Sequence, residues 1–246
     1  MMTSKKVFLS ARWQHLAMIN YQVDPAILQP YLPPYTELDL FEGRALVSMV
    51  GFLFTNTKVF GFKWPFHTDF EEVNLRFYVR YFDGQQYRRG AVFISEIVPR
   101  RIIATMANLL YHEHYSYMPM KHAIKQTTNT ISASFKWKKN GWNELQVEAG
   151  TTLQNMVEGS EEAFIFEHYW GYSQYNATTT IEYGVEHPSW QVHRVVNWKL
   201  DCEIEALYGA AFVPYLSAEP SSAFMAAGSD VVIVKPRFIT SSEQLS

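Results

Sequence analysis

The segment EEVNLRFYVRYFDGQQYRRGAVFISEI, residues 71–97, decides the fold class of this chain. Its apolar and charged residues alternate with a period of two, which is typical of a β-strand that buries one face. One face would carry Leu75, Phe77, Val79 and Tyr81, and the other would carry Arg76, Tyr78 and Arg80. The turn signal Asp83-Gly84 interrupts the alternation, which resumes at Ala91–Ile94. The segment therefore predicts a β-hairpin.

Further strands are predicted on both sides of this hairpin. Turn signals lie between apolar runs at Glu42-Gly43 and at Asn140-Gly141, and each predicts another hairpin. Residues 162–198 favour three more strands, and Val231–Val234 favours a last one.

Helix signals are few and short. Asp24 before Pro25 predicts a short helix, since Asp is a good N-cap and Pro suits the first helical position. From Arg101 the apolar spacing becomes three and four, which predicts a helix ending near His112. A third short helix is expected around Cys202–Tyr208. Together these signals predict a mainly β chain, a β-rich α+β fold built on a curved antiparallel sheet or barrel.

The composition excludes several classes of protein. Hydrophobic residues make up 48% of the 246 residues and aromatic residues 16%, enough for a large core and for apolar pocket walls. The net charge of −3 gives no support to nucleic-acid binding. No window approaches the roughly 18 apolar residues needed to cross a membrane. The single cysteine and the lack of a signal-peptide pattern favour a cytoplasmic protein, and the absence of linkers and repeats favours one domain, residues 1–246.

Six stretches carry a resemblance to a known family: RWQHLAMINYQVDPAILQPYLPP, ELDLFEGRALVSMVGF, EVNLRFYVR, RRGAVFISEIVPRR, EHYWGY and SAFMAAGSDVVIV. Over about Val7 to Val234 the chain resembles the YqjF-like bacterial family, a domain of unknown function (2071). That family is similar, more remotely, to the acetoacetate decarboxylase superfamily. The resemblance implies a curved antiparallel barrel around an apolar pocket, and chemistry on a small carbonyl or carboxylate compound. Relatives in that superfamily assemble, so a homo-oligomer is compatible with it.

The chain departs from the decarboxylase pattern at the residues that carry the chemistry. The decarboxylase motif is a Glu followed by Pro-Lys-Lys at the end of a strand, and one lysine forms a Schiff base with the substrate. The match in this chain is SEIVPRR, with Arg100 and Arg101, and a guanidinium cannot form a Schiff base. The alternative placement, YMPMKHA, retains only Lys121. The Schiff-base lysine pair is therefore absent.

Metal and cofactor signals are weak. His112 and His114 would share one face if they lie on a strand, as zinc or iron ligands often do, but would diverge on a helix. No compact third-ligand motif accompanies them. The chain also has no phosphate-cradling glycine loop and no dinucleotide fingerprint. Neither a metal nor a cofactor is predicted.

The aromatic run FEHYWGYSQ, residues 166–174, is the first candidate site. On a strand, Phe166, His168, Trp170 and Tyr172 would project to one side. They would form an aromatic wall for a ligand, with His168 as a catalytic proton carrier or hydrogen-bonding group. The alternative is a core histidine whose imidazole is satisfied by a backbone carbonyl.

Charged residues form the second candidate site. Arg76 and Arg101 would bind a ligand carboxylate if they face inward, because apolar and acidic neighbours could hold them there. Glu72 would act as a general base if burial raises its pKa. The alternative for the arginines is a solvated strand surface. For Glu72 it is an exposed carboxylate beside Glu71 at the strand entrance, or an ion pair with Arg76.

Two functions follow from these candidates. The first is a barrel that binds a small apolar or carboxylate-bearing metabolite without catalysis. The second is an enzyme that hydrates, dehydrates or enolises a small keto acid or carbonyl compound, with Arg76 or Arg101 as anchor and Glu72 or His168 moving the proton. A structural or interaction protein is a third alternative. An enclosed pocket where these residues converge would favour the enzyme.

Overall fold

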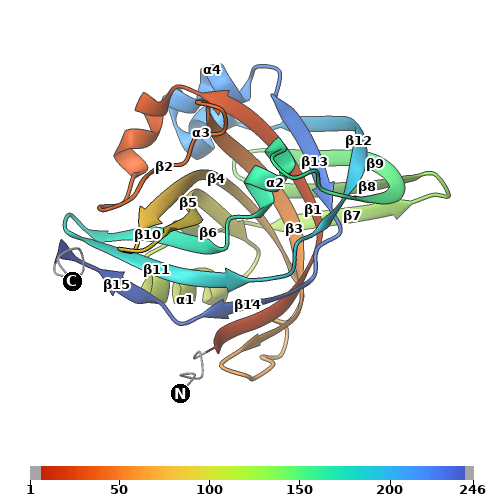
Figure 1. The fold of residues 1–246 in the computed structure, drawn as a ribbon. Helices are drawn as coiled ribbons and strands as arrows, with labels where there is room; N and C mark the ends of the chain where they lie inside the picture. The colour runs from red at the N-terminus through yellow and green to blue at the C-terminus, as the bar shows by residue number, and fades with distance from the viewer. Residues whose placement is uncertain (1–6, 242–246) are drawn as a thin grey trace.

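The computed structural model describes residues 7–241, and strands dominate it (Figure 1). The strands are β1 Val7–Val23, β2 Glu37–Leu38, β3 Ala45–Val59, β4 Phe70–Phe82, β5 Tyr87–Val98, β6 Tyr115–Tyr117, β7 Met120–Gln126, β8 Thr130–Lys138, β9 Trp142–Asn155, β10 Trp170–Asn176, β11 Thr179–Glu186, β12 Gln191–Asp201, β13 Ser222–Ala226, β14 Asp230–Val234 and β15 Arg237–Ile239. The helices are η1 Pro25–Tyr31, α1 Arg101–Tyr111, α2 Glu161–Phe166, α3 Ile204–Tyr208, η2 Ala210–Phe212 and α4 Val213–Leu216. No helix within residues 7–241 is long and apolar enough to cross a membrane.

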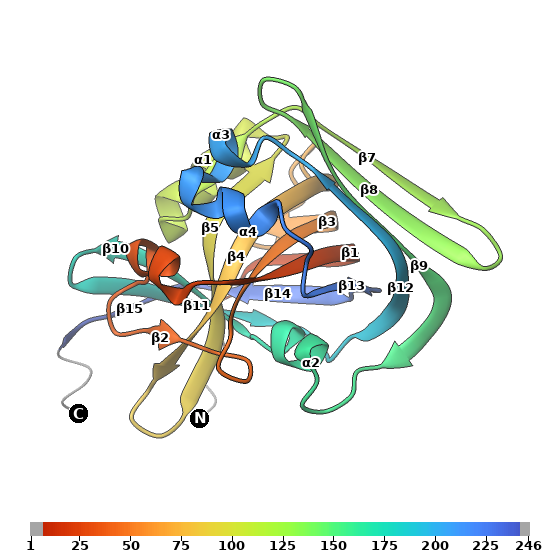
Figure 2. The same ribbon diagram turned by 90° about the horizontal axis from the view of Figure 1, so that it is seen from above.

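Seven strands close on themselves to form a barrel. Neighbours pair in the order β14, β11, β10, β5, β4, β3 and β1, and the first half of β1 pairs back with β14. The second half of β1 pairs instead with β13, and from there the sheet continues through β12, β9, β8 and β7. In Figure 2 these outer strands curl away from the barrel as a long curved extension. The prediction of a mainly β, barrel-like fold is confirmed.

The hairpin of residues 71–97 forms as its pattern predicts. β4 and β5 pair antiparallel, and Asp83 accepts hydrogen bonds from the backbone N–H groups of Gln85 and Gln86 in the turn between them. Gly84 has a φ of 93°, which glycine adopts without strain. The hairpin predicted at Asn140-Gly141 also forms, between β8 and β9.

The alternation along β4 separates two cores. The face with Leu75 and Phe77 packs against the extension through Phe135 and Trp137, under η1, α3, η2 and α4. The opposite face carries Phe70 and Tyr78 and packs against α1, α2 and Trp190. Glu72 and Arg76 occupy this second face, because they lie two and six positions after Phe70 and side chains alternate between faces along a strand.

One local prediction was wrong, and one was incomplete. The aromatic run of residues 166–174 is not one strand, because α2 extends to Phe166 before β10 starts at Trp170. The helix forms because the Ser160 hydroxyl accepts a hydrogen bond from the Ala163 N–H, and two glutamates occupy its first turn. Val231–Val234 lies in β14 as predicted, but β15 follows it and pairs with β11.

Candidate functional site

A cavity of about 170 Å³ lies between α1 and the ends of β1, β3, β4, β11 and β14. Most of its wall is apolar, from side chains that include Phe8, Phe54, Phe70, Ile102 and Met106. Its titratable side chains are Glu72, Glu113, Tyr111, Tyr115, Tyr183 and His67. Two carboxyl groups therefore border a cavity whose remaining surface is largely aromatic and aliphatic, and we call it the Glu72–Glu113 cavity.

Glu72 comes from β4 and is 3% exposed. Asn74 donates a hydrogen bond to its Oε1 at 2.9 Å, and the Tyr115 hydroxyl donates one to its Oε2 at 3.0 Å. Burial raises the pKa of Glu72 to about 7, although these hydrogen bonds and the charge of Arg76 oppose the rise. The Glu72 carboxyl is therefore close to half protonated at neutral pH.

Glu113 reaches the cavity from the connection between α1 and β6. His112 ends α1 with a φ of 51°, and this left-handed residue turns the chain back towards the barrel. The Asn108 side chain then fixes the connection, because it accepts from the Tyr115 N–H at 2.8 Å and donates to the Tyr115 carbonyl at 2.9 Å. Glu113 and Tyr115 are thereby held on the cavity side.

The Glu113 carboxyl is only half satisfied. The Tyr183 hydroxyl donates to its Oε1 at 2.6 Å, while its Oε2 is buried and has no hydrogen-bond partner among the described residues. Burial, assisted by the nearby charge of Glu72, raises the pKa of Glu113 to about 8, although the hydrogen bond from Tyr183 opposes the rise. The hydroxyl of Thr57, which also lines the cavity, is likewise buried without a partner in residues 7–241.

A third glutamate, Glu96 of β5, lies behind this pair. It is 2% exposed, and its pKa is raised well above the usual range by burial and then by the charges of Glu113 and Glu72. Within the described part of the chain, no three His, Cys, Asp or Glu side chains form a group that could hold a metal ion. The cluster can instead exchange protons near neutral pH, or hydrogen-bond a ligand as either acid or carboxylate.

Among the residues that the sequence singled out, Glu72 lines the cavity and Arg76 lies nearby. Arg76 shares the face of Glu72, and its guanidinium lies 5.7 Å from the ring centre of Tyr78. The Arg76 Nε is buried without a hydrogen-bond partner among residues 7–241. Arg76 does not line the cavity, although its charge acts on Glu72.

His168 is buried outside the cavity wall. Its Nε2 lies 3.1 Å from Asp39 Oδ2, and Arg89 Nε donates to the same oxygen at 2.6 Å. Burial lowers the pKa of His168 to about 4, against the opposing effect of Asp39. The partner of this imidazole is therefore a carboxylate, not the backbone carbonyl that the core alternative supposed.

The remaining candidates are dispersed. Arg101 is exposed at the start of α1 and lies over the Tyr117 ring, so the expectation that it faces inward was wrong. Phe166 packs on Trp190 and Phe224. Trp170 is half-buried under the guanidinium of Arg88. The common aromatic face of residues 166–172 does not exist, because the helix–turn–strand break separates these side chains.

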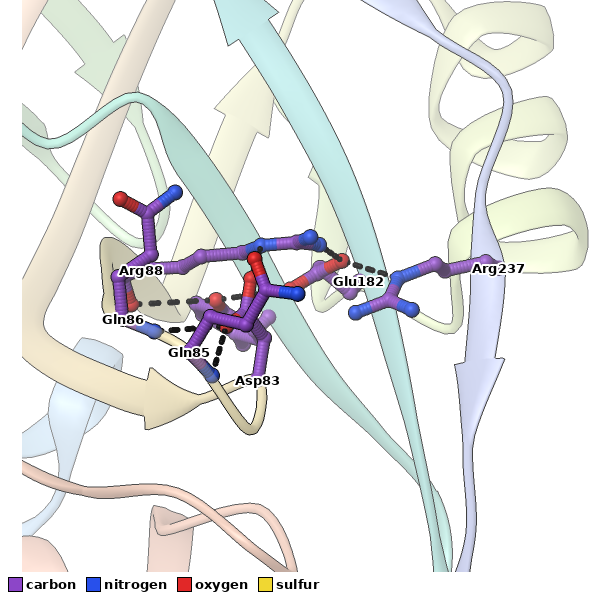
Figure 3. Close-up of polar contacts among 7 residues, drawn as sticks. Asp83, Gln85, Gln86, Arg88, Glu182 and Arg237 are labelled. Atoms are coloured by element: carbon purple, nitrogen blue, oxygen red, sulfur yellow. Dashed lines mark hydrogen bonds and ion pairs between the residues drawn. The ribbon is translucent and has the colours of Figure 1, made fainter. Parts of the chain in front are cut away.

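Tyr172 belongs to a different polar cluster, shown in part in Figure 3. Its hydroxyl donates to Glu182 Oε1 at 3.0 Å. Arg88 Nη1 donates to Glu182 Oε2 at 2.9 Å, and Arg237 Nε donates to the same oxygen. Asp83 accepts a further hydrogen bond from Arg88 Nε at 2.8 Å. These residues tie β5, β10, β11 and β15 together and do not line the cavity.

The sequence reasoning missed most of the cavity. Of the three buried glutamates, only Glu72 is a sequence-predicted site residue, whereas Glu113 and Glu96 are not. The available signal was the local context, because Glu96 precedes Ile97 and Val98, and Glu113 lies between Tyr111-His112 and His114-Tyr115. Glutamate is rarely fully buried without a partner, so such contexts favour a functional site.

Comparison with known proteins agrees with this architecture. Residues 10–230 match the family DUF2071, described as "Uncharacterized conserved protein". The "Uncharacterized protein YqjF" of Bacillus subtilis (strain 168) is 32% identical over 110 residues, which are 44% of each chain, so the match spans less than half of that relative.

Solved structures share the fold at low sequence identity. The acetoacetate decarboxylase from Legionella pneumophila is 12% identical with a TM-score of 0.64, over 98% of this chain and 92% of that chain. An acetoacetate decarboxylase-like enzyme from Sphingomonas wittichii RW1 is 12% identical with a TM-score of 0.63, over 96% and 94%. The enduracididine biosynthesis enzyme MppR complexed with pyruvate is 11% identical with a TM-score of 0.62, over 96% and 91%. The chain therefore belongs to the DUF2071 family and has the fold of the acetoacetate decarboxylase-like proteins.

Proposed function

We propose that this protein binds a small, largely apolar compound in the Glu72–Glu113 cavity, with a polar group of the compound at the carboxyl end. The observation that carries the proposal is the pair of unpartnered buried atoms, Glu113 Oε2 and Thr57 Oγ1, on the wall of an otherwise apolar cavity. Buried polar atoms in folded proteins almost always have a hydrogen-bond partner. A ligand that fills the cavity would supply a hydrogen-bond partner for these atoms.

The apolar class of ligand has more support than the carboxylate-bearing class. The described lining residues include no lysine and no arginine that could pair with a carboxylate. A ligand carboxylate would also face Glu72 and Glu113, and like charges in a buried site repel strongly. Arg76 lies on the neighbouring part of the same face but outside the lining.

A second candidate function is proton transfer on a small carbonyl compound. It is favoured by the pKa of Glu72, about 7, because general acid–base catalysis works best near the operating pH. MppR is similar in fold and its structure holds pyruvate, so a small carbonyl compound is a reasonable substrate class to test. The cavity has no lysine for a Schiff base among its described residues, so the proton would move through Glu72 or Glu113.

A matched pair of cavity variants tests the proposal. Ala107 lines the cavity, whereas Thr105 is exposed on the same helix. Ala107→Phe fills the space, and Thr105→Phe adds the same side chain outside it. The thermal-shift screen uses apolar amines, alcohols, ketones and acids, and a ligand at 100 times its Kd stabilises by about 2.7 kcal/mol.

We expect at least one hit with the wild type and with Thr105→Phe that disappears in Ala107→Phe. Hits that survive in Ala107→Phe would place binding elsewhere and contradict the proposal. Turnover is then followed by proton exchange at the carbon next to the carbonyl of any ketone that binds. Exchange that is lost in Glu72→Gln, in a variant that still binds, would support the enzyme.

A further inference from the structure

The charge around the Glu72–Glu113 cavity is one-sided. Three buried carboxyl groups influence one another there, those of Glu72, Glu96 and Glu113. The other titratable or charged groups that face them are the phenols of Tyr111, Tyr115 and Tyr183, His67 on the wall, and Arg76 along β4. Three acids thus face one guanidinium and one imidazole. None of the three glutamates makes an ion pair within residues 7–241.

The site also has too few hydrogen-bond donors. Phenols and the Asn74 amide supply donors to both oxygens of Glu72 and to one oxygen of Glu113. Glu113 Oε2 remains without one in the described residues, although the residue is only 7% exposed and lines the cavity. What the site lacks is a group that donates hydrogen bonds and carries positive charge. An ammonium group does both, since it has three donors and no acceptor.

The walls suit the body of such a ligand. Phe54 and Phe70 stack with ring centres 4.7 Å apart, and the Tyr111 ring lies 4.9 Å from Phe8 and 4.8 Å from Tyr183. Aromatic faces attract a cation within about 6 Å and pack well against an apolar body. A desolvated ammonium ion in the cavity would therefore lie close to the aromatic rings of its wall and to the carboxylates of Glu72 and Glu113.

We propose that the Glu72–Glu113 cavity binds a primary amine with a small apolar or aromatic body. The ammonium group of this amine would donate hydrogen bonds to the carboxylates of Glu113 and Glu72. This inference rests on the proposed function and names the ligand class. An amine differs from the two other ligand classes. A ligand carboxylate would be repelled by ionised glutamates, and a neutral ketone would need a protonated glutamate as its hydrogen-bond donor.

The direction of pH dependence separates these classes. An ammonium ion pairs with an ionised carboxylate, and the raised pKa values of Glu72 and Glu113 mean that protons must leave when it binds at pH 6. Amine affinity therefore increases as pH rises to 8.5, because alkylamines, like lysine with a pKa of about 10.4, stay protonated. A neutral hydrogen-bond acceptor needs the protonated carboxyl, so its affinity decreases over the same range.

The experiment uses four probes with the same ring: benzylamine, benzyl alcohol, acetophenone and benzoate. Isothermal titration calorimetry of the full chain at pH 6.0 and 8.5, in two buffers of different ionisation enthalpy, gives each Kd and the number of protons released. We expect benzylamine to bind tightest, with a Kd at least about tenfold lower at pH 8.5 and with net proton release at pH 6.0. The Thr105→Phe variant, altered outside the cavity, should show the same dependence of the benzylamine Kd on pH.

The variant Glu113→Gln keeps the shape of the side chain and removes its charge. It should weaken benzylamine about tenfold or more at pH 8.5 and change benzyl alcohol by less than threefold. If benzyl alcohol or acetophenone binds tighter than benzylamine and tighter at pH 6.0, the amine assignment is overturned while the proposed pocket stands. If none of the four probes binds and Ala107→Phe has no effect on any thermal shift, the pocket itself fails. If Glu113→Gln does not fold, the dependence of the benzylamine Kd on pH in the wild type still decides whether the ligand is an amine.

Discussion

The protein buries glutamates in two contrasting ways. Glu182 has a fully buried side chain, yet two arginines and the Tyr172 hydroxyl contact its oxygens, as Figure 3 shows for the arginines. Glu113 and Glu72 are nearly as buried, but within residues 7–241 they receive neutral donors and no ion pair. The first arrangement satisfies the charge within the fold. The second leaves a carboxyl group available to a ligand, and burial without an ion pair raises the pKa of that carboxyl group.

The largest expected effect comes from breaking the satisfied arrangement. Glu182→Ala leaves Arg88 and Arg237 without their shared carboxylate, and the Tyr172 hydroxyl keeps only the Arg88 carbonyl oxygen, at 3.2 Å, as an acceptor. We expect the free energy of unfolding to fall by about 3 kcal/mol, at the low end for a broken buried pair because both arginines reach solvent. Urea unfolding at pH 7.5 measures it. A change below about 1 kcal/mol would show that the arginines find other partners.

The second prediction concerns the pH dependence of stability. The pKa values of Glu72, Glu96 and Glu113 are raised in the folded protein, so the folded state binds more protons than the unfolded state. Stability from these groups is complete below about pH 4.3, the unfolded pKa, and is lost as pH rises through the folded values.

The free energy of unfolding without ligand should therefore decrease by roughly 1–3 kcal/mol between pH 7 and pH 9. His168 contributes little in this range, because its pKa is lowered to about 4 in the folded state and it is mostly neutral above pH 7 in the unfolded state, where its pKa is about 6.5. Urea midpoints across the range, for the wild type and for Glu113→Gln, provide the test. The raised pKa values would be contradicted if the free energy of unfolding of the wild type did not change with pH, or if Glu113→Gln showed the same change as the wild type.

The third prediction separates His168 from the ligand site. His168→Leu removes the imidazole that hydrogen-bonds Asp39, and it should destabilise the fold by about 1–2 kcal/mol. Because His168 does not line the cavity, the Kd of any cavity ligand should stay within about twofold of the wild type. Calorimetric titration of the folded variant is the check. A loss of ten times or more in affinity would return His168 to the list of ligand-binding residues.

The smallest effect is expected at Arg101. The side chain is exposed over the Tyr117 ring and contacts no acid within ion-pair distance in residues 7–241. Arg101→Ala should shift Tm by about 1 °C or less and leave ligand binding unchanged. A thermal-shift assay with a cavity ligand suffices, and weaker binding in this variant would show that the arginine reaches the cavity in solution.

Local patterns predicted the framework of this fold because they are physical properties of short segments. The alternation of Leu75, Phe77 and Val79 and the turn at Asp83-Gly84 specify the β4–β5 hairpin without help from the rest of the chain. The number of short strands already indicated a curved sheet or barrel, and the resemblance to the DUF2071 family implied the same architecture, but no single segment encodes which strands close the barrel. The aromatic run of residues 166–174 does not form one strand, because the cap at Ser160 starts a helix that extends to Phe166.

The cavity could be predicted only in part, because its acids converge from separate elements. Glu72 is on β4, Glu96 on β5, and Glu113 in the connection that follows α1. Their proximity depends on the left-handed residue His112 and on the Asn108 bridge to Tyr115, which fix the chain reversal. Neither the closure of the barrel nor that reversal can be read from spacing along the sequence.

A direct titration of the glutamate side chains tests whether Glu72 and Glu113, unlike Glu182, are buried without a compensating charge. The protein is labelled with ¹³C at the glutamate carboxyl carbon, and the signals are followed by NMR from pH 4 to pH 10, with Glu72→Gln and Glu113→Gln used for assignment. Two signals should titrate near pH 7 and pH 8, and each should be missing from its own variant. If both signals titrate below about pH 5, as ordinary glutamates do, the carboxyl groups are satisfied within the fold and the cavity does not hold acids for a ligand.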